Sequence, residues 1–139
     1  MSRRFARETA MKIIFQMAFN NDELNYEGAQ QYKESGEEQL DVNNYQYLED
    51  VTSKASTELP IIDSHIDKMS ENWKIERLSR VDLSIMRLAI CEMIYFDDIP
   101  VRVSINEAVE LAKKFSTDKA SSYINGILDK IAEQLKRDR

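Results

Sequence analysis

The sequence predicts an all-α protein, a bundle of about seven helices joined by short connections. Apolar side chains recur at the helical period along most of the chain. Only three glycines and two prolines are present, too few for the many turns of an all-β fold. At 139 residues, the chain fits a single domain that is large enough to bury its own core.

The N-terminal half contains three clear apolar stripes. The first predicts a helix from Arg3 to about Phe19. Residues 26–41 are polar and contain two glycines, so only one or two short helices fit there. The next stripes predict a helix over residues 42–57 and another that begins near Pro60, with Trp73 on its buried side.

Two capping patterns predict where the following helices begin. Ser79 and Asp82 stand at S-x-x-D spacing and open a helix that stops before Pro100. Ser104 and Glu107 stand at S-x-x-E spacing, which predicts a capping box in which each side chain satisfies a free N–H group at the helix start. A short polar connection then leads to the final helix.

Asn106 and the pair Asn125-Gly126 weaken the last two helices, which are otherwise well formed. We interpret both asparagines as buried amides that bond to the backbone or to each other and lock these helices together. Gly126 then allows the helices to approach closely. An RNA contact by Asn125 is the less favoured alternative.

Charge is distributed unevenly along the chain. The formal net charge is −6, but residues 1–20 carry +3, residues 21–72 carry −10, and residues 73–139 carry +1. Because salt screens exposed charges over about 8 Å, a basic end can bind a polyanion even on an acidic protein.

Several classes of protein are disfavoured. Cys91 is the only cysteine, so no intrachain disulfide can form, and we expect a reduced, cytoplasmic setting. No signal-peptide pattern or membrane-length apolar run is present. His65 lacks a second ligand at metal-binding spacing, and no glycine-rich phosphate loop exists. We therefore expect no enzyme, metal or cofactor, and we expect Glu92 to pair with Arg87 or a backbone group.

Arg3, Arg4 and Arg7 lie in the first turns of the first helix, where the helix dipole disfavours cations. Arg3 and Arg7 also form a like-charged i,i+4 pair, which costs about 0.2–0.5 kcal/mol. A pattern that weakens the helix favours a functional interpretation, in which the guanidinium groups contact phosphates or bases. The alternative is a frayed, solvated N-terminus.

Three blocks in order carry a family resemblance. They are RRFARETAMKIIFQM at residues 3–17, WKIERLSRVDLSIMRLAICEMIY at residues 73–95, and residues 99–132 with INEAVELAKKF and YINGILDKI. This combination resembles the NusB family of bacterial transcription antitermination factors. The resemblance implies the NusB fold, with two packed three-helix subdomains at about residues 1–72 and 73–139.

The same resemblance implies a function. Members of the family bind the boxA element of nascent ribosomal RNA transcripts together with NusE, a small-subunit ribosomal protein. The complex joins other Nus factors on RNA polymerase, which then resists premature termination. The resemblance also implies a part in small-subunit ribosome assembly. Because no apolar run approaches membrane length, we expect no membrane partner.

Residue by residue, the resemblance assigns RNA contacts to Arg3, Arg4, Arg7, Lys119 and Tyr123. Tyr123 occupies the family's aromatic position beside RNA, and an exposed aromatic ring can stack on an unpaired base. A core or subunit contact is the alternative for Tyr123. Lys119 lies in the connection before the final helix, where a cation favours phosphate, and an ordinary solvated lysine is the alternative.

Two further residues are assigned to the contact with NusE. Phe15 matches an aromatic position of the first helix, although an aromatic beside a buried stripe is commonly part of the core. Asp82 matches an acidic position, although helix capping alone can account for it. A protein-interaction adaptor or assembly factor with little RNA binding of its own is the alternative function, and a homodimer is left open.

Overall fold

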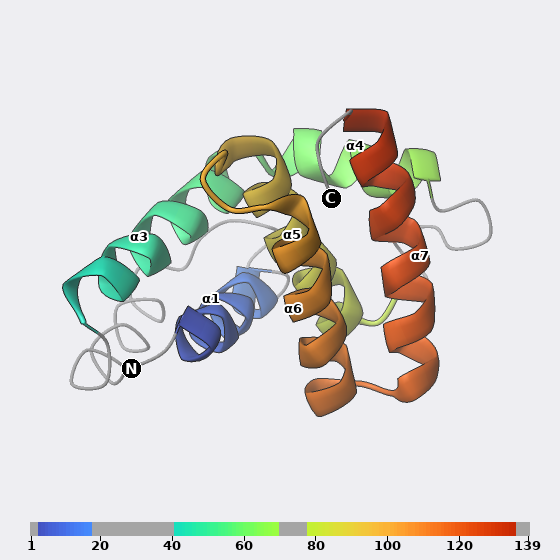
Figure 1. The fold of residues 1–139 in the computed structure, drawn as a ribbon, viewed down its shortest axis with the longest axis horizontal. Coiled ribbons are helices and arrows are strands. Elements are labelled where there is room, and N and C mark those ends of the chain that lie inside the picture. The colour runs from blue at the N-terminus through green and yellow to red at the C-terminus, as the bar shows by residue number, and fades with distance from the viewer. Residues whose placement is uncertain (1–2, 18–40, 70–77, 136–139) are drawn as a thin grey trace.

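The computed structural model describes residues 3–17, 41–69 and 78–135. These ranges contain six helices and no strand, as predicted for an all-α fold (Figure 1). One or two short helices are expected within residues 26–41, of which residues 26–40 lie outside the described residues. Trp73, for which burial is predicted, also lies outside them. The helices are α1 (Arg3–Met17), α3 (Val42–Thr57), α4 (Leu59–Met69), α5 (Arg80–Tyr95), α6 (Val101–Phe115) and α7 (Asp118–Leu135).

The central element is α5, which packs against α1, α3, α4, α6 and α7. Every residue from Asp82 to Met93 is buried, so this helix is covered on all sides. In Figure 1, α5 lies behind α6, between α1 and α3 on one side and α7 on the other. The side chains of α5 therefore decide how the other helices are joined.

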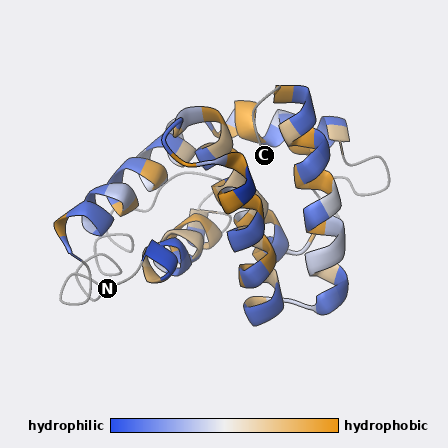
Figure 2. Ribbon diagram, viewed as in Figure 1, coloured by the Kyte–Doolittle hydropathy of each residue, from blue (hydrophilic) through white to orange (hydrophobic). Residues whose placement is uncertain are grey.

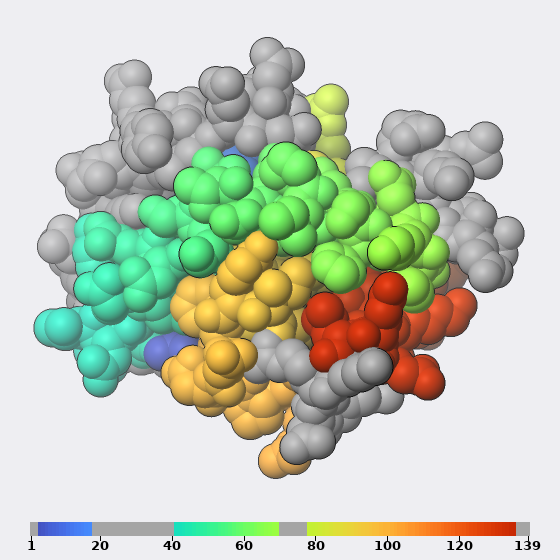
Figure 3. Space-filling model, turned by 90° about the horizontal axis from the view of Figure 1, so that it is seen from above, coloured from blue at the N-terminus to red at the C-terminus, as the bar shows by residue number. Residues whose placement is uncertain are grey.

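The outer helices each bury one face. Hydrophobic and hydrophilic segments alternate along them in Figure 2, as the predicted stripes require. Figure 3 shows α4 lying across the top of the molecule, between α3 and the C-terminal end of α7. The buried residues of all six helices form one cluster, whose largest fully buried members are Ile13, Ile14, Met17, Leu48, Ile62, Ile66, Ile85, Met86, Leu88, Ile90, Met93 and Ile124.

The predicted start of α5 is confirmed, because Ser79 Oγ accepts a hydrogen bond of 3.0 Å from the Asp82 N–H. The predicted start of α6 is wrong. This helix begins at Val101, with Pro100 as the residue before it, so Ser104 already lies inside the helix. Since proline suits a helix start without any side-chain cap, Ser104 and Glu107 are free to bond to other helices.

The expectation for the asparagines is also wrong. Asn106 and Asn125 are both exposed on the outer faces of α6 and α7. A Cβ atom added at Gly126 would meet nothing within 4 Å, so no close helix approach depends on this glycine. The helices α6 and α7 contact each other, and both contribute buried apolar side chains to the same core cluster, among them Ile105, Ala108 and Ile124.

Candidate functional site

A buried polar network joins the arginine-rich helix to the centre of the protein. Arg7 is only 5% exposed. Its Nε donates to Glu92 Oε2 at 2.8 Å and its Nη2 donates to Oε1 at 3.1 Å. The Tyr47 hydroxyl donates to the same carboxylate, and so does Ser104 Oγ, at 2.8 Å. Glu92 on α5 therefore accepts bonds from α1, α3 and α6.

The charges of this network are compatible with its burial. Burial alone would lower the pKa of Arg7, but the hydrogen bonds and charge of Glu92 raise it above its ordinary value. Burial, and then the charge of Glu92, hold the pKa of Tyr47 well above its ordinary value. The network is thus a guanidinium and a carboxylate, paired and bonded by neutral hydroxyl groups.

The expected pairing of Glu92 with Arg87 or a backbone group is therefore wrong. Arg87 instead donates two bonds to Asp63, of 2.9 and 2.8 Å, and so joins α5 to α4. Each of the two arginine–carboxylate pairs thus joins α5 to a different helix. The side chain of Arg7, expected to contact RNA, is buried and bonded to Glu92 in this structure.

Arg3 and Arg4 lie nearer the surface than Arg7. Arg3 is half-buried; its Nε donates to Asn44 Oδ1 at 2.8 Å, and its guanidinium lies 4.3 Å from the centre of the Tyr47 ring. The side chain of Arg4 is 58% exposed. Its Nε and Nη2 donate to the two oxygens of Glu107 at 3.0 and 2.7 Å, in a bidentate pair.

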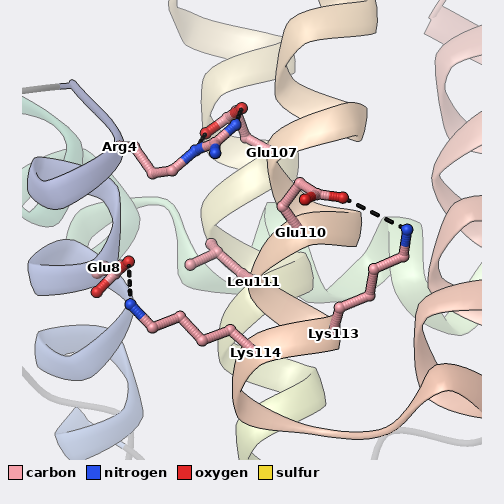
Figure 4. A pocket seen from close by; sticks show the side chains of 7 residues that line it. All are labelled: Arg4, Glu8, Glu107, Glu110, Leu111, Lys113 and Lys114. Atoms are coloured by element: carbon pink, nitrogen blue, oxygen red, sulfur yellow. Dashed lines mark hydrogen bonds and ion pairs between the residues drawn. The ribbon is translucent and has the colours of Figure 1, made fainter.

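Arg4 and Glu107 stand at one end of a groove between α1 and α6, shown in Figure 4. Lys114 Nζ bonds to Glu8 Oε2 at 2.8 Å and makes a second bridge between the two helices. Leu111 lies between the two bridges (Figure 4). The groove has a volume of about 360 Å³ and is lined by Arg4, Glu8, Glu107, Glu110, Leu111, Lys113 and Lys114.

The remaining candidates lie on α1, α5 and α7. Lys119 is exposed and belongs to the first turn of α7, not to the connection before it. Tyr123 is half-buried and its hydroxyl donates to Asp82 Oδ2. Asp82, the acidic candidate for the NusE contact, is only 4% exposed. Phe15 is half-buried on α1.

Five of the seven candidates thus fall into two groups rather than one pocket. Arg3, Arg4 and Arg7 gather near Glu92, and Tyr123 lies against Asp82. Ten residues of α5 separate these two acids, which corresponds to about 15 Å along the helix axis. Any ligand that touches both groups must therefore be an extended molecule.

Sequence reasoning missed Glu107 and Tyr47 as partners of the arginines. The proline at position 100 is a usable signal for Glu107, because a helix that starts beside it leaves Glu107 well inside the helix. For Tyr47 no comparable signal exists, since its contacts depend on how α3 packs against α1.

Within the described ranges, the protein offers neither a metal site nor a membrane span. No group of three or more histidine, cysteine, aspartate and glutamate side chains in those ranges is placed to hold a metal ion. No helix in the same ranges is long and apolar enough to cross a membrane.

The fold and the site define an all-α protein whose central helix ties a basic first helix to the rest of the molecule. Residues 4–133 match the model of the NusB family. The transcription antitermination protein NusB of Natranaerobius thermophilus is 63% identical to this chain over 139 residues, which is 100% of both chains. The chain belongs to the NusB family.

Further relatives and solved structures support this family assignment. The transcription antitermination protein NusB of Alkaliphilus oremlandii is 44% identical over 134 residues, covering 96% of this chain and 95% of its own. The T. maritima NusB structure has 33% identity and a TM-score of 0.80, over 96% of this chain and 92% of its own. A structure of the antitermination factors NusB and NusE in complex with dsRNA has 27% identity and a TM-score of 0.81. The match covers 95% of this chain and 96% of the chain in that structure.

Proposed function

We propose that this protein is a transcription antitermination factor that binds boxA-type RNA of nascent ribosomal RNA transcripts together with the ribosomal protein NusE. It acts by binding, within the antitermination complex on RNA polymerase in the cytoplasm, and not by catalysis. The full-length identity of 63% to a transcription antitermination protein carries this proposal. The solved structure of the antitermination factors NusB and NusE in complex with dsRNA supports NusE and RNA as partners.

Arg3, Arg4, Lys119 and Tyr123 are the proposed RNA contacts. The exposed Arg4 guanidinium can bond bidentately to a phosphate, and Lys119 offers a point charge beside the start of α7. Tyr123 is held through its hydroxyl, so its ring is a fixed platform for a stacked base.

Arg7 takes a different part in this proposal. Its pairing with Glu92 holds α1 against α5 and so positions Arg3 and Arg4. Arg7 is a positioning residue and not a contact residue.

For the protein partner, the half-buried Phe15 is the proposed direct contact. Asp82 is buried, and its role is to hold Tyr123 and to place the start of α5. Its second oxygen, Oδ1, has no hydrogen-bond partner among the residues that the structure describes, which leaves an acceptor for a basic group of a partner that uncovers it.

A titration of RNA into the purified protein, with and without NusE, tests the proposal. We expect binding of a boxA-type single strand that tightens when NusE is added. A scrambled single strand and a duplex of the same length serve as controls. The double variant Arg3→Ala/Arg4→Ala should weaken binding by about tenfold or more, because it removes two charge-assisted hydrogen-bond donors.

The adaptor function is the second candidate, favoured by the net charge of −6 and by the acidic partner that already occupies Arg4. It predicts that NusE binds while RNA affinity is equally weak for boxA-type and scrambled strands. The same titration therefore separates the two functions.

A further inference from the structure

The Arg4–Glu107 pair has the geometry that an arginine uses to bind phosphate. Two neighbouring N–H groups of one guanidinium edge point at two oxygens, at 3.0 and 2.7 Å. The oxygens of a phosphate accept the same fork. In the free protein, a carboxylate thus occupies the edge of Arg4 that is best suited to RNA.

The two partners differ in how firmly they are held. The side chain of Arg4 is 58% exposed, whereas that of Glu107 is 16% exposed. Glu107 also lies 3.9 Å from Nη1 of the buried Arg7. Arg4 can therefore turn away toward a ligand without leaving Glu107 unpaired, and Glu107 stays in place.

Glu107 also keeps its charge at neutral pH. The hydrogen bond from Arg4 lowers the pKa of this carboxyl below its ordinary value, and the charges of Arg4 and Arg7 act in the same direction. A phosphate that approaches Arg4 therefore meets a fixed negative charge on α6.

We propose that Glu107 is an internal competitor for the phosphate of the RNA: it occupies the guanidinium of Arg4 in the free protein and limits how tightly RNA binds there. This inference rests on the proposed function, because it assumes that Arg4 contacts RNA. It adds Glu107, on the opposite side of the groove from Arg4, as a residue that sets the affinity for RNA. A weakly bound anion cannot displace Glu107, whereas a strand held at several points can.

The variant Glu107→Gln tests this inference, and Glu110→Gln is its matched control. Both residues line the same groove on α6, and both changes remove one negative charge. Glu110 pairs with Lys113 of its own helix, at 3.5 Å, while the hydrogen bonds of Arg4 go to Glu107. We expect Glu107→Gln to bind the single-stranded RNA about two- to fivefold more tightly than Glu110→Gln does, the range set by an exposed ion pair.

A second pair of variants keeps the test decisive. In an Arg4→Ala background, Glu107→Gln should improve affinity no more than Glu110→Gln does. Equal affinities of the two single variants, at matched melting temperatures, would overturn the inference while leaving RNA binding intact. Failure of the wild type to prefer the boxA-type strand, with and without NusE, would instead overturn the proposed function.

Discussion

At the scale of single residues, Glu92 is the most informative side chain. It is buried at the centre of the protein and accepts hydrogen bonds from Arg7, Tyr47 and Ser104. A buried charge is stable only when it is paired and fully hydrogen-bonded. Removing one partner of such a pair leaves the other charge uncompensated. Loss of the Glu92 carboxylate should therefore weaken the packing of α1, α3 and α6 against α5 and lower the free energy of unfolding.

The change Glu92→Gln should therefore destabilise the protein by about 3–5 kcal/mol, because Arg7 keeps its charge in a buried position. Urea unfolding of this variant beside Glu110→Gln measures the difference. Because Glu110 is exposed, Glu110→Gln should lower the free energy of unfolding by less than about 0.5 kcal/mol. A cost below about 1 kcal/mol for Glu92→Gln would show that the network does not hold α1 in place.

Tyr123 allows stability and RNA binding to be separated. Its ring is the proposed stacking platform, and its hydroxyl is bonded to the buried Asp82. Tyr123→Phe keeps the ring and should cost about 1.5–3 kcal/mol of stability, with RNA affinity unchanged. Tyr123→Ala should in addition weaken RNA binding by about 1–3 kcal/mol. Equal RNA affinities for the two variants would remove Tyr123 from the RNA contacts.

At the scale of elements, the sequence predicts the helices well and their mutual contacts poorly. Apolar periodicity correctly predicts the described helices, and the Ser79–Asp82 capping pattern correctly predicts the start of α5, because both signals lie within or next to one helix. The start of α6 is missed because Ser104 fits two roles, and only tertiary packing shows that it bonds to Glu92. Asn106 and Asn125 weaken their helices, which suggests a buried structural role, but both side chains are exposed on the outer faces of α6 and α7.

The same limit applies to the candidate site. The three arginines stand out in the sequence, because they lie at the wrong end of a helix dipole. Their side chains lie in different surroundings, however, because Arg7 is buried and Arg4 is exposed. Adjacent turns of one helix give no hint of this difference, which depends on where Glu92 and Glu107 lie in the assembled fold.

Asn125 and Gly126 are exposed on α7, and a double substitution tests whether they hold α6 against α7. Replacing both with alanine should raise stability by up to about 1 kcal/mol, since alanine is the better helix former and the added Cβ meets open space. Thermal unfolding of Asn125→Ala/Gly126→Ala measures this. Destabilisation by more than about 1 kcal/mol would restore the interpretation that these residues lock α6 to α7.

At the scale of the whole molecule, the buried hydrophobic residues of the described ranges form one cluster, and α5 packs against all five other helices of these ranges. Cys91 lies inside it and is fully buried. Burial, followed by the charge of Glu92, raises the pKa of the thiol from 9.0 to about 12. Between these two pKa values the unfolded chain loses the thiol proton while the folded protein keeps it. The free energy of unfolding is therefore unaffected by this group below the unfolded pKa and falls as the pH rises toward about 12.

Cys91 should accordingly report on global unfolding. At pH 8 and without denaturant, the thiol should react with an aromatic disulfide reagent only as fast as the protein opens, and in urea one thiol per chain should react at once. Rapid reaction of the native protein would show that α5 is accessible without global unfolding.

The central claim, that the first-turn arginines of α1 bind the phosphates of RNA, is tested most directly by salt dependence. The affinity of the protein, with NusE bound, for a boxA-type single strand is measured over a series of salt concentrations. Each phosphate that the protein no longer neutralises should reduce the slope of log affinity against log salt by about 0.7 for a single strand. Arg4→Ala should therefore show a slope shallower by about this amount than the wild type. Identical slopes for the two proteins would contradict the account.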